Sequence, residues 1–165
     1  NEEFLHLISQ IRALSPDAGI RSNFIVGFPG ETHEQFMQTY QVLADLKLDV
    51  AHLARYSTRN GTVADRKMID DVPEDEKMTR FRTLEDLQEQ IVSEINGRLL
   101  GQTVDVLFEE KVKDRWRGRT PTNKLVFAES AEDLRGKVLP VQITWAGPWS
   151  MQGSLIRKPI TLSIA

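Results

Sequence analysis

The sequence predicts two fold classes in one chain: an α/β unit followed by a small antiparallel β-barrel. In the first part, apolar residues recur every three or four positions in some segments and run continuously in others, which is typical of helices that alternate with buried strands. After residue 98, apolar residues occupy every second position in short segments, and Gly, Pro or charged turns separate these segments. We therefore expect a parallel sheet over 1–72, a connecting helix over 73–98 and a barrel over 99–165.

The α/β elements are expected in the order helix, strand, helix, strand. Residues 4–14 have the apolar spacing of one helix face, and residues 20–27 end in an apolar run typical of a strand. Thr32 with Gln35 predicts a capping box that opens the second helix, and residues 48–56 predict the second strand. Because two strands cannot close a barrel or a doubly wound sheet, we expect further strands before the first residue and interpret the chain as a fragment.

A long polar segment and a helix link the two parts. The segment 57–72 is unusually long for a passive connection and indicates either a functional loop or an irregular return segment. Pro73 followed by three acidic residues is typical of a helix start, and this helix should run to about Asn96. We expect its apolar seam to pack on the α/β unit, through Met78, Phe81, Leu84, Leu87, Ile91 and Ile95.

The C-terminal part is predicted to contain four or five short strands and most of the positive charge. Residues 99–165 carry 10 Lys+Arg against 7 Asp+Glu, although the whole chain has a formal net charge of −3. Most of the excess comes from six neighbouring cations: Lys111, Lys113, Arg115, Arg117, Arg119 and Lys124. This concentration indicates either a polyanion-binding surface or a solvated basic loop.

Residues 115–124 favour RNA among polyanions. Guanidinium groups suit phosphates, the indole of Trp116 suits base stacking, and hydroxyl and amide groups suit sugar or base edges. Trp145 and Trp149 flank a Gly-Pro turn. Their rings could pack in the core or the turn, which is the favoured interpretation, or they could form a stacking platform, and both interpretations stay open.

Composition excludes several other classes of chemistry. The 165 residues include no cysteine and three scattered histidines, so we expect no disulfide, no thiolate nucleophile and no metal site. No apolar run approaches the roughly 20 residues needed to cross a bilayer, and no signal-peptide pattern opens the chain. We expect a cytoplasmic protein with no membrane contact.

The Gly-rich turn over 27–32 could hold an anion, although its spacing alone favours a plain turn.

Three segments together resemble a known family. Residues 22–32 (SNFIVGFPGET), residues 56–64 (Tyr-Ser-x-Arg-x-Gly-Thr-x-Ala) and residues 118–127 (Gly-Arg-Thr-x-Thr-Asn-Lys-Leu-Val-Phe) occur in the order seen in radical-SAM tRNA methylthiotransferases of the MiaB type. The first segment is common to many radical-SAM proteins, whereas the ordered set is specific. The resemblance implies that 1–72 are the C-terminal portion of a radical-SAM partial barrel, that 73–98 form a helix packed on it, and that 99–165 form a TRAM RNA-binding barrel.

The resemblance also implies an activity. Such enzymes use S-adenosylmethionine and two 4Fe-4S clusters to add a methylthio group to carbon two of isopentenyladenosine, next to the tRNA anticodon. The cluster-binding cysteines of the family would lie before the first residue, so this chain alone is expected to be inactive. We expect a monomer that binds the anticodon stem-loop. Two alternatives remain open: a ribosomal-protein aspartate methylthiotransferase and a stand-alone RNA-binding module.

Individual residues are carried over from the family motifs. The resemblance places Ile25, Gly27, Gly30 and Glu31 near the adenosyl group of S-adenosylmethionine, and it places Arg59 near the substrate. The RNA-binding residues it implies are Arg117, Arg119, Thr122, Asn123 and Lys124. The chain departs from the family pattern in having Asn23 where Asp is usual, and Asn60 and Val63 where prolines are common.

Overall fold

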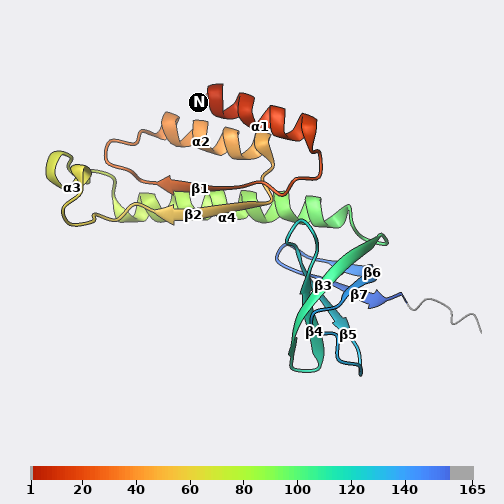
Figure 1. The fold of residues 1–165 in the computed structure, drawn as a ribbon. Helices are drawn as coiled ribbons and strands as arrows, with labels where there is room; N and C mark the ends of the chain where they lie inside the picture. The colour runs from red at the N-terminus through yellow and green to blue at the C-terminus, as the bar shows by residue number, and fades with distance from the viewer. Residues whose placement is uncertain (1, 157–165) are drawn as a thin grey trace, which may run out of the picture. The chain divides into compact units, whose positions relative to one another are not determined.

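The computed structural model describes residues 2–156, so residues 157–165 of the expected barrel segment lie outside the described part. The chain forms two compact units that meet in sequence between Val92 and Ser93 (Figure 1). The first unit contains α1 (Glu2–Leu14), β1 (Arg21–Val26), α2 (His33–Leu46), β2 (Val50–Arg55), α3 (Val63–Lys67) and most of α4 (Glu74–Gly97).

The sheet of the first unit consists of β1 and β2, which pair in parallel from Arg21 opposite Val50 to Val26 opposite Arg55. The connection between them is α2, as the alternation of elements predicted. The predicted capping box at the start of α2 is confirmed. The Thr32 hydroxyl accepts a hydrogen bond from the Gln35 backbone at 3.2 Å, and the Gln35 side chain accepts one from the Thr32 backbone at 3.0 Å.

One face of this sheet is covered and the other is open. Helices α1 and α2 lie together on one side of the strands (Figure 1), where Val26, Phe36 and Leu43 are buried. Ile25 points to the opposite face and is 56% exposed. Within residues 2–156, no further strand pairs with the outer edge of β1. The unit therefore presents an uncovered face on which Ile25 lies with Asn23 and His52, and an unpaired strand edge.

Helix α4 buries a different face from the one predicted. Of the expected seam, Leu84 and Ile91 are buried, whereas the other four residues are only half-buried. The buried face instead includes three polar side chains, Lys77, Arg80 and Gln88. Each has a partner in the same unit, and the Gln88 amide donates 3.1 Å to a backbone carbonyl just before β2. Polar groups can replace apolar ones here because each makes at least one hydrogen bond or ion pair, although the side-chain oxygen of Gln88 is buried without a partner.

The second unit is a closed barrel, as predicted. Its strands are β3 (Thr103–Val112), β4 (Arg115–Arg119), β5 (Leu125–Glu129), β6 (Val138–Ala146) and β7 (Met151–Leu155), in the order β3-β4-β5-β7-β6. The expectation of purely antiparallel pairing was wrong at one junction, because β5 and β7 run parallel. Five strands in a closed ring cannot all alternate in direction, so one neighbouring pair must be parallel.

The barrel core decides which face of β4 is accessible. Trp116 is only 4% exposed and belongs to the buried cluster with Phe108 and Val126, so the predicted stacking of its indole on a base was wrong. Gly118 also faces inward, and a Cβ there would lie 2.6 Å from the Leu107 carbonyl oxygen. Because side chains alternate along a strand, the arginines of β4 point outward.

No helix in the part of the chain that the structure describes is long and apolar enough to cross a membrane.

Candidate nucleic-acid interface and the glycine-rich turn

Three arginines form a stripe along the outer face of β4. Arg115, Arg117 and Arg119 occupy alternate positions of the strand, with Trp116 and Gly118 between them in the interior. Arg115 is exposed, and the other two are partly exposed. The stripe is the barrel surface from which cations can reach a polyanion.

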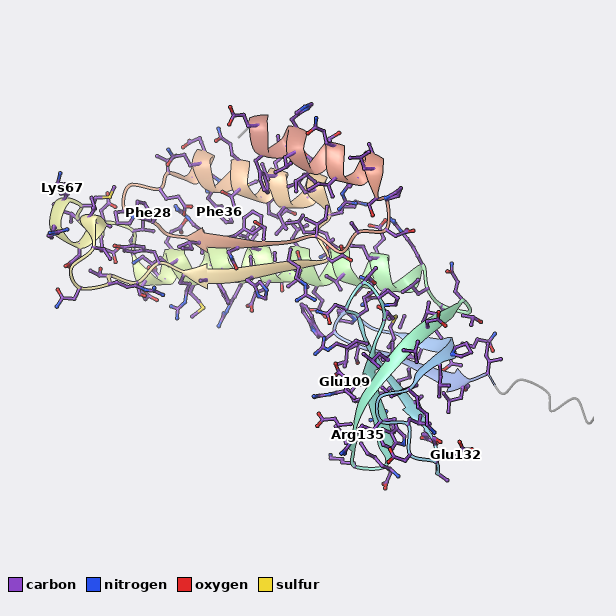
Figure 2. The ribbon with its side chains drawn as sticks, in the orientation of Figure 1. Phe28, Phe36, Lys67, Glu109, Glu132 and Arg135 are labelled. Carbon is purple, nitrogen blue, oxygen red and sulfur yellow. The ribbon has the colours of Figure 1, made fainter. Side chains whose placement is uncertain are left out.

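Two carboxylates of β3 lie beside this stripe. A bulge between Phe108 and Glu110 interrupts the β3–β4 register. Glu109 projects from the barrel (Figure 2) and lies 3.6 Å from Arg119, measured from Oε2 to Nε, while Glu110 forms an ion pair with Arg117. Sequence reasoning did not select these glutamates, because their proximity to the arginines depends on strand pairing. Exposed ion pairs of this kind contribute about 0–1 kcal/mol to the free energy of unfolding. A phosphate can therefore replace the glutamate as the partner of each arginine.

The turn after β4 is organised by its own side chains. The Thr120 hydroxyl accepts a hydrogen bond from the Lys124 backbone at 3.0 Å and lies 3.1 Å from the Thr122 hydroxyl. Asn123 has a φ of 63°, and its side-chain oxygen accepts a hydrogen bond from Arg119 at 3.1 Å. The turn residues carried over from the family motif therefore lie together, and Asn123 orients Arg119.

The second candidate site is the turn after β1. Gly27 and Gly30 have φ values of 72° and 79°, in the left-handed region that favours glycine. Glu31 closes the turn by accepting a hydrogen bond on Oε2 from the Gly27 backbone at 2.7 Å. The same oxygen accepts one from Arg80 of α4 at 2.6 Å.

Arg80 holds the turn on α4. Its Nη1 also donates to the Glu31 carbonyl at 2.9 Å, and its Nε donates to Glu76 at 2.9 Å. Burial is the largest single influence on the pKa of Arg80 and lowers it, but the hydrogen bonds and charges of Glu31 and Glu76 outweigh burial and raise the pKa overall. The guanidinium is therefore permanently charged. Sequence reasoning missed Arg80; the signal was a cation at helical spacing from the buried Leu84.

Gly27 is fixed by a second contact with α4. A Cβ at this position would lie 2.3 Å from Cγ of Lys77, whose side chain is 4% exposed. Lys77 Nζ contacts Asp70 at 2.6 Å and lies 5.4 Å from the centroid of the Tyr56 ring. The Tyr56 ring in turn contacts Phe28 of the turn, with centroids 5.1 Å apart. The turn is thus packed against α4 at its first residue.

The remaining predicted residues are more accessible. Gly30 is exposed, and its N–H donates to Asp71 at 2.7 Å. Arg59 is exposed in the loop after β2, where its carbonyl accepts hydrogen bonds from the backbone and hydroxyl of Thr62. Ile25, Gly27, Gly30 and Glu31 therefore cluster at the end of β1, whereas Arg59 lies on a separate loop.

The donor groups of the chain do not fit an iron–sulfur cluster. The sequence contains no cysteine, and within residues 2–156 no group of three or more His, Asp or Glu side chains is arranged to hold a metal ion. Cluster ligation requires thiolates in most proteins. Any cluster that acts with these residues must be held by other parts of a protein.

Comparison with known proteins identifies the barrel first. Residues 97–156 match the TRAM domain family. The match spans all five strands of the closed barrel, so the barrel is similar to a TRAM domain. Among solved structures, a multidomain protein with nucleic acid binding domains from Streptococcus pneumoniae has a TM-score of 0.31 and 19% identity, covering 36% of this chain and 23% of that chain; this likeness is too weak to carry an argument.

The relatives extend the match to nearly the whole chain. Proteins named tRNA-2-methylthio-N(6)-dimethylallyladenosine synthase are 46% identical over 98% of this chain in Roseiflexus sp. and 42% identical over 95% in Dehalococcoides mccartyi. The corresponding protein of Chloroflexus aurantiacus is 48% identical over 89% of the chain. The chain covers 35%, 38% and 32% of these relatives, about a third of their length. The predicted resemblance to tRNA methylthiotransferases is confirmed.

Proposed function

We propose that this chain is the RNA-binding C-terminal part of an enzyme that adds a methylthio group to carbon two of isopentenyladenosine, next to the anticodon of tRNA. One observation carries this proposal: the chain matches synthases of that modified nucleoside over 89–98% of its length. The arginine stripe of β4 supplies the physical counterpart, because cations on an exposed strand suit the phosphates of RNA. We further propose a monomer that acts in the cytoplasm.

Residues 1–72 of the first unit are proposed to be the C-terminal portion of a radical-SAM partial barrel, with residues 73–98 packed on it and a TRAM domain over 99–165. Its parallel β1–α2–β2 arrangement, the uncovered face that includes Ile25 and the unpaired edge of β1 support this assignment. Parallel sheets are normally covered on both faces, and further strands at the edge of β1 that close the sheet into a barrel would enclose the open face.

The turn after β1 is proposed to contribute one wall of an S-adenosylmethionine site. Ile25 offers an exposed apolar side chain on the open sheet face. Nothing lies within 4 Å of the position a Cβ would take at Gly30, so a ligand can approach the backbone there. Gly27 and Glu31 would hold the shape of the wall through Lys77 and Arg80. When bound, S-adenosylmethionine and two 4Fe-4S clusters would supply the radical and the sulfur. Arg59 is proposed to contact the substrate from its loop.

The RNA-binding part of the proposal can be tested with the 165-residue chain. Affinity for an anticodon stem-loop RNA should fall as salt rises, with a logarithmic slope of about −0.7 for each phosphate contact in a single-stranded region. Arg119→Ala should weaken binding and reduce the slope by about one contact. Fluorescence anisotropy at several salt concentrations measures both. A flat salt response would contradict phosphate binding.

The catalytic part of the proposal has a separate test. The isolated chain, incubated with reductant, S-adenosylmethionine and tRNA, should form no methylthio product, because it contains no cluster ligand. Mass spectrometry of nucleosides from the digested tRNA detects the product. Methylthiolation by these residues alone would contradict the proposal that the iron–sulfur clusters must be held by other parts of the enzyme.

A further inference from the structure

A groove of about 300 Å³ crosses β5 and β7 on the outer face of the barrel. The polar and aromatic residues that line it include Arg115, Phe127, Glu129, Thr144, Gln152 and Ser154. Arg115 is also the first residue of the arginine stripe, so the groove and the stripe are continuous. Its size suits a small planar group with a few polar contacts.

A bulge in β6 adds an indole to this surface. Ile143 pairs with Gly153 and Trp145 pairs with Gln152, so Thr144 is an extra residue in the strand. Regular alternation would place Trp145 in the interior with Ile143, but Trp145 is 48% exposed. Bulges commonly redirect a side chain beside a functional site. Here the bulge places Trp145 directly across from Gln152, a residue that lines the groove.

The Arg115 guanidinium that lines the groove and the Trp145 indole on the neighbouring strand are both held in place. The Trp145 ring packs over Gly147, where a Cβ would lie 2.3 Å from its Cη2 atom. On the other side, Cζ of Arg115 lies 5.3 Å from the centroid of the half-buried Phe127 ring. A guanidinium stacked on one ring presents its second face to another planar group. One flat surface, the Arg115–Phe127 stack, therefore lines the groove, and a second, the Trp145 ring, lies on the neighbouring strand with its backbone opposite Gln152.

Polar groups with unused hydrogen-bonding capacity lie between these surfaces. The Thr144 hydroxyl donates to the Gln152 carbonyl at 3.3 Å. Among the described residues, the structure gives no partner to the Gln152 side-chain amide or to the Ser154 hydroxyl. An amide and a hydroxyl can bond both donors and acceptors of a base edge or a ribose. The carboxylate of Glu129 also lines the groove and repels phosphate, which favours a base in the groove and phosphates on the arginine stripe.

We propose that this groove binds one unpaired nucleotide of the RNA, with its base beside Trp145 and the Arg115–Phe127 stack. This inference rests on the proposed RNA binding and names the form of RNA that the barrel selects. Base faces in a duplex are covered by their neighbours, so only an unstacked base can use these planar surfaces. From β4 to β6 there are three strand spacings, about 14 Å, which keeps phosphates of the same RNA strand within reach of the stripe.

The test compares a single-stranded RNA with a blunt-ended two-strand RNA duplex of the same base composition, using the whole chain. Trp145→Leu should lower affinity for the single strand by about fivefold to a hundredfold and change binding of the duplex by less than about twofold. Gln152→Ala should act in the same direction without removing an aromatic ring. Trp149→Leu is the matched control, because Trp149 is 63% exposed and, unlike Trp145, is not paired with a residue that lines the groove. Circular dichroism confirms that each variant is folded.

The outcomes separate the two proposals. Selective loss of single-strand binding in both groove variants, with Trp149→Leu unchanged, supports the groove. Normal single-strand affinity in Trp145→Leu and Gln152→Ala overturns the groove while RNA binding stands. Equal losses in Trp145→Leu and Trp149→Leu also overturn it. Failure of the unmodified chain to bind either RNA refutes the proposed function, and the groove with it.

Discussion

The two units use the same pair of chemical groups in opposite ways. In the first unit, Arg80 contacts Glu31 at 2.6 Å, and the two side chains are 7% and 11% exposed. On the barrel, Arg119 contacts Glu109 at 3.6 Å, and both side chains are 39% exposed. Burial therefore decides whether an arginine–glutamate contact holds the backbone or leaves the cation available to a ligand.

The energetic reason is the cost of an unpaired charge. Removing one member of a buried pair leaves the other without solvent or partner and costs about 3–5 kcal/mol, whereas an exposed pair contributes about 0–1 kcal/mol. Glu31 therefore cannot exchange partners without loosening the turn after β1. Arg119 can exchange Glu109 for a phosphate at little cost.

The largest effect is expected for Arg80→Ala. It should lower the free energy of unfolding of the first unit by about 3–5 kcal/mol, because Glu31 loses its buried partner. Denaturant titration followed by the helical circular dichroism signal measures the change. Arg55→Ala is the matched control in the same unit, because Arg55 forms an exposed ion pair with Glu74, and it should cost less than about 1 kcal/mol. Equal losses in the two variants would contradict the distinction between buried and exposed pairs.

Two glycines of the turn sharpen the comparison further. Both have positive φ, so alanine at either position should cost about 1–2 kcal/mol of backbone strain. Gly27→Ala also forces a Cβ into the buried side chain of Lys77 and should cost about 1–3 kcal/mol more than Gly30→Ala. Parallel denaturant titrations of the two variants decide this. The prediction is wrong if Gly30→Ala is the more destabilised.

The exposed pair gives a smaller effect on stability and a visible effect on binding. Glu109→Gln should change the free energy of unfolding by less than about 1 kcal/mol. It should increase affinity for RNA severalfold, because Arg119 then lacks a competing carboxylate. Anisotropy titrations of Glu109→Gln and Arg119→Ala should therefore move in opposite directions. Weaker RNA binding by Glu109→Gln would indicate that this glutamate orients the arginine rather than competing for it.

The smallest effect concerns pH. The pKa of Glu34, in the first turn of α2, is lowered mainly by a backbone hydrogen bond and also by one from Thr32. A lowered pKa in the folded state stabilises the protein above the ordinary glutamate value of 4.5, and this contribution is lost as pH falls below it. As the pH is lowered from about 5 to about 3, Glu34→Gln should therefore lose slightly less stability than the unmodified chain. An identical pH profile in both proteins would exclude a role for Glu34.

Local sequence patterns predicted local structure well. The capping box at Thr32, the acidic start of α4 and the barrel strands depend on neighbours in sequence, so each was visible in the residues alone. Arg80 was not, because its partner Glu31 is 49 residues away. The two-residue period also could not reveal a bulge. It therefore left the exposure of Trp145 undecided, while Trp116, selected for stacking, proved to be buried.

The parallel junction has a consequence for how the barrel assembles. Strands β3, β4 and β5 form one antiparallel group, β6 and β7 form a hairpin, and the β5–β7 seam that helps to join them contains only three residue pairs. Local hairpins form faster than pairings between distant segments, so this seam is expected to close late in folding. The groove spans the seam and exists only when it is shut. An RNA nucleotide bound in the groove would contact both strands of this short seam, and its binding free energy would stabilise the closed barrel.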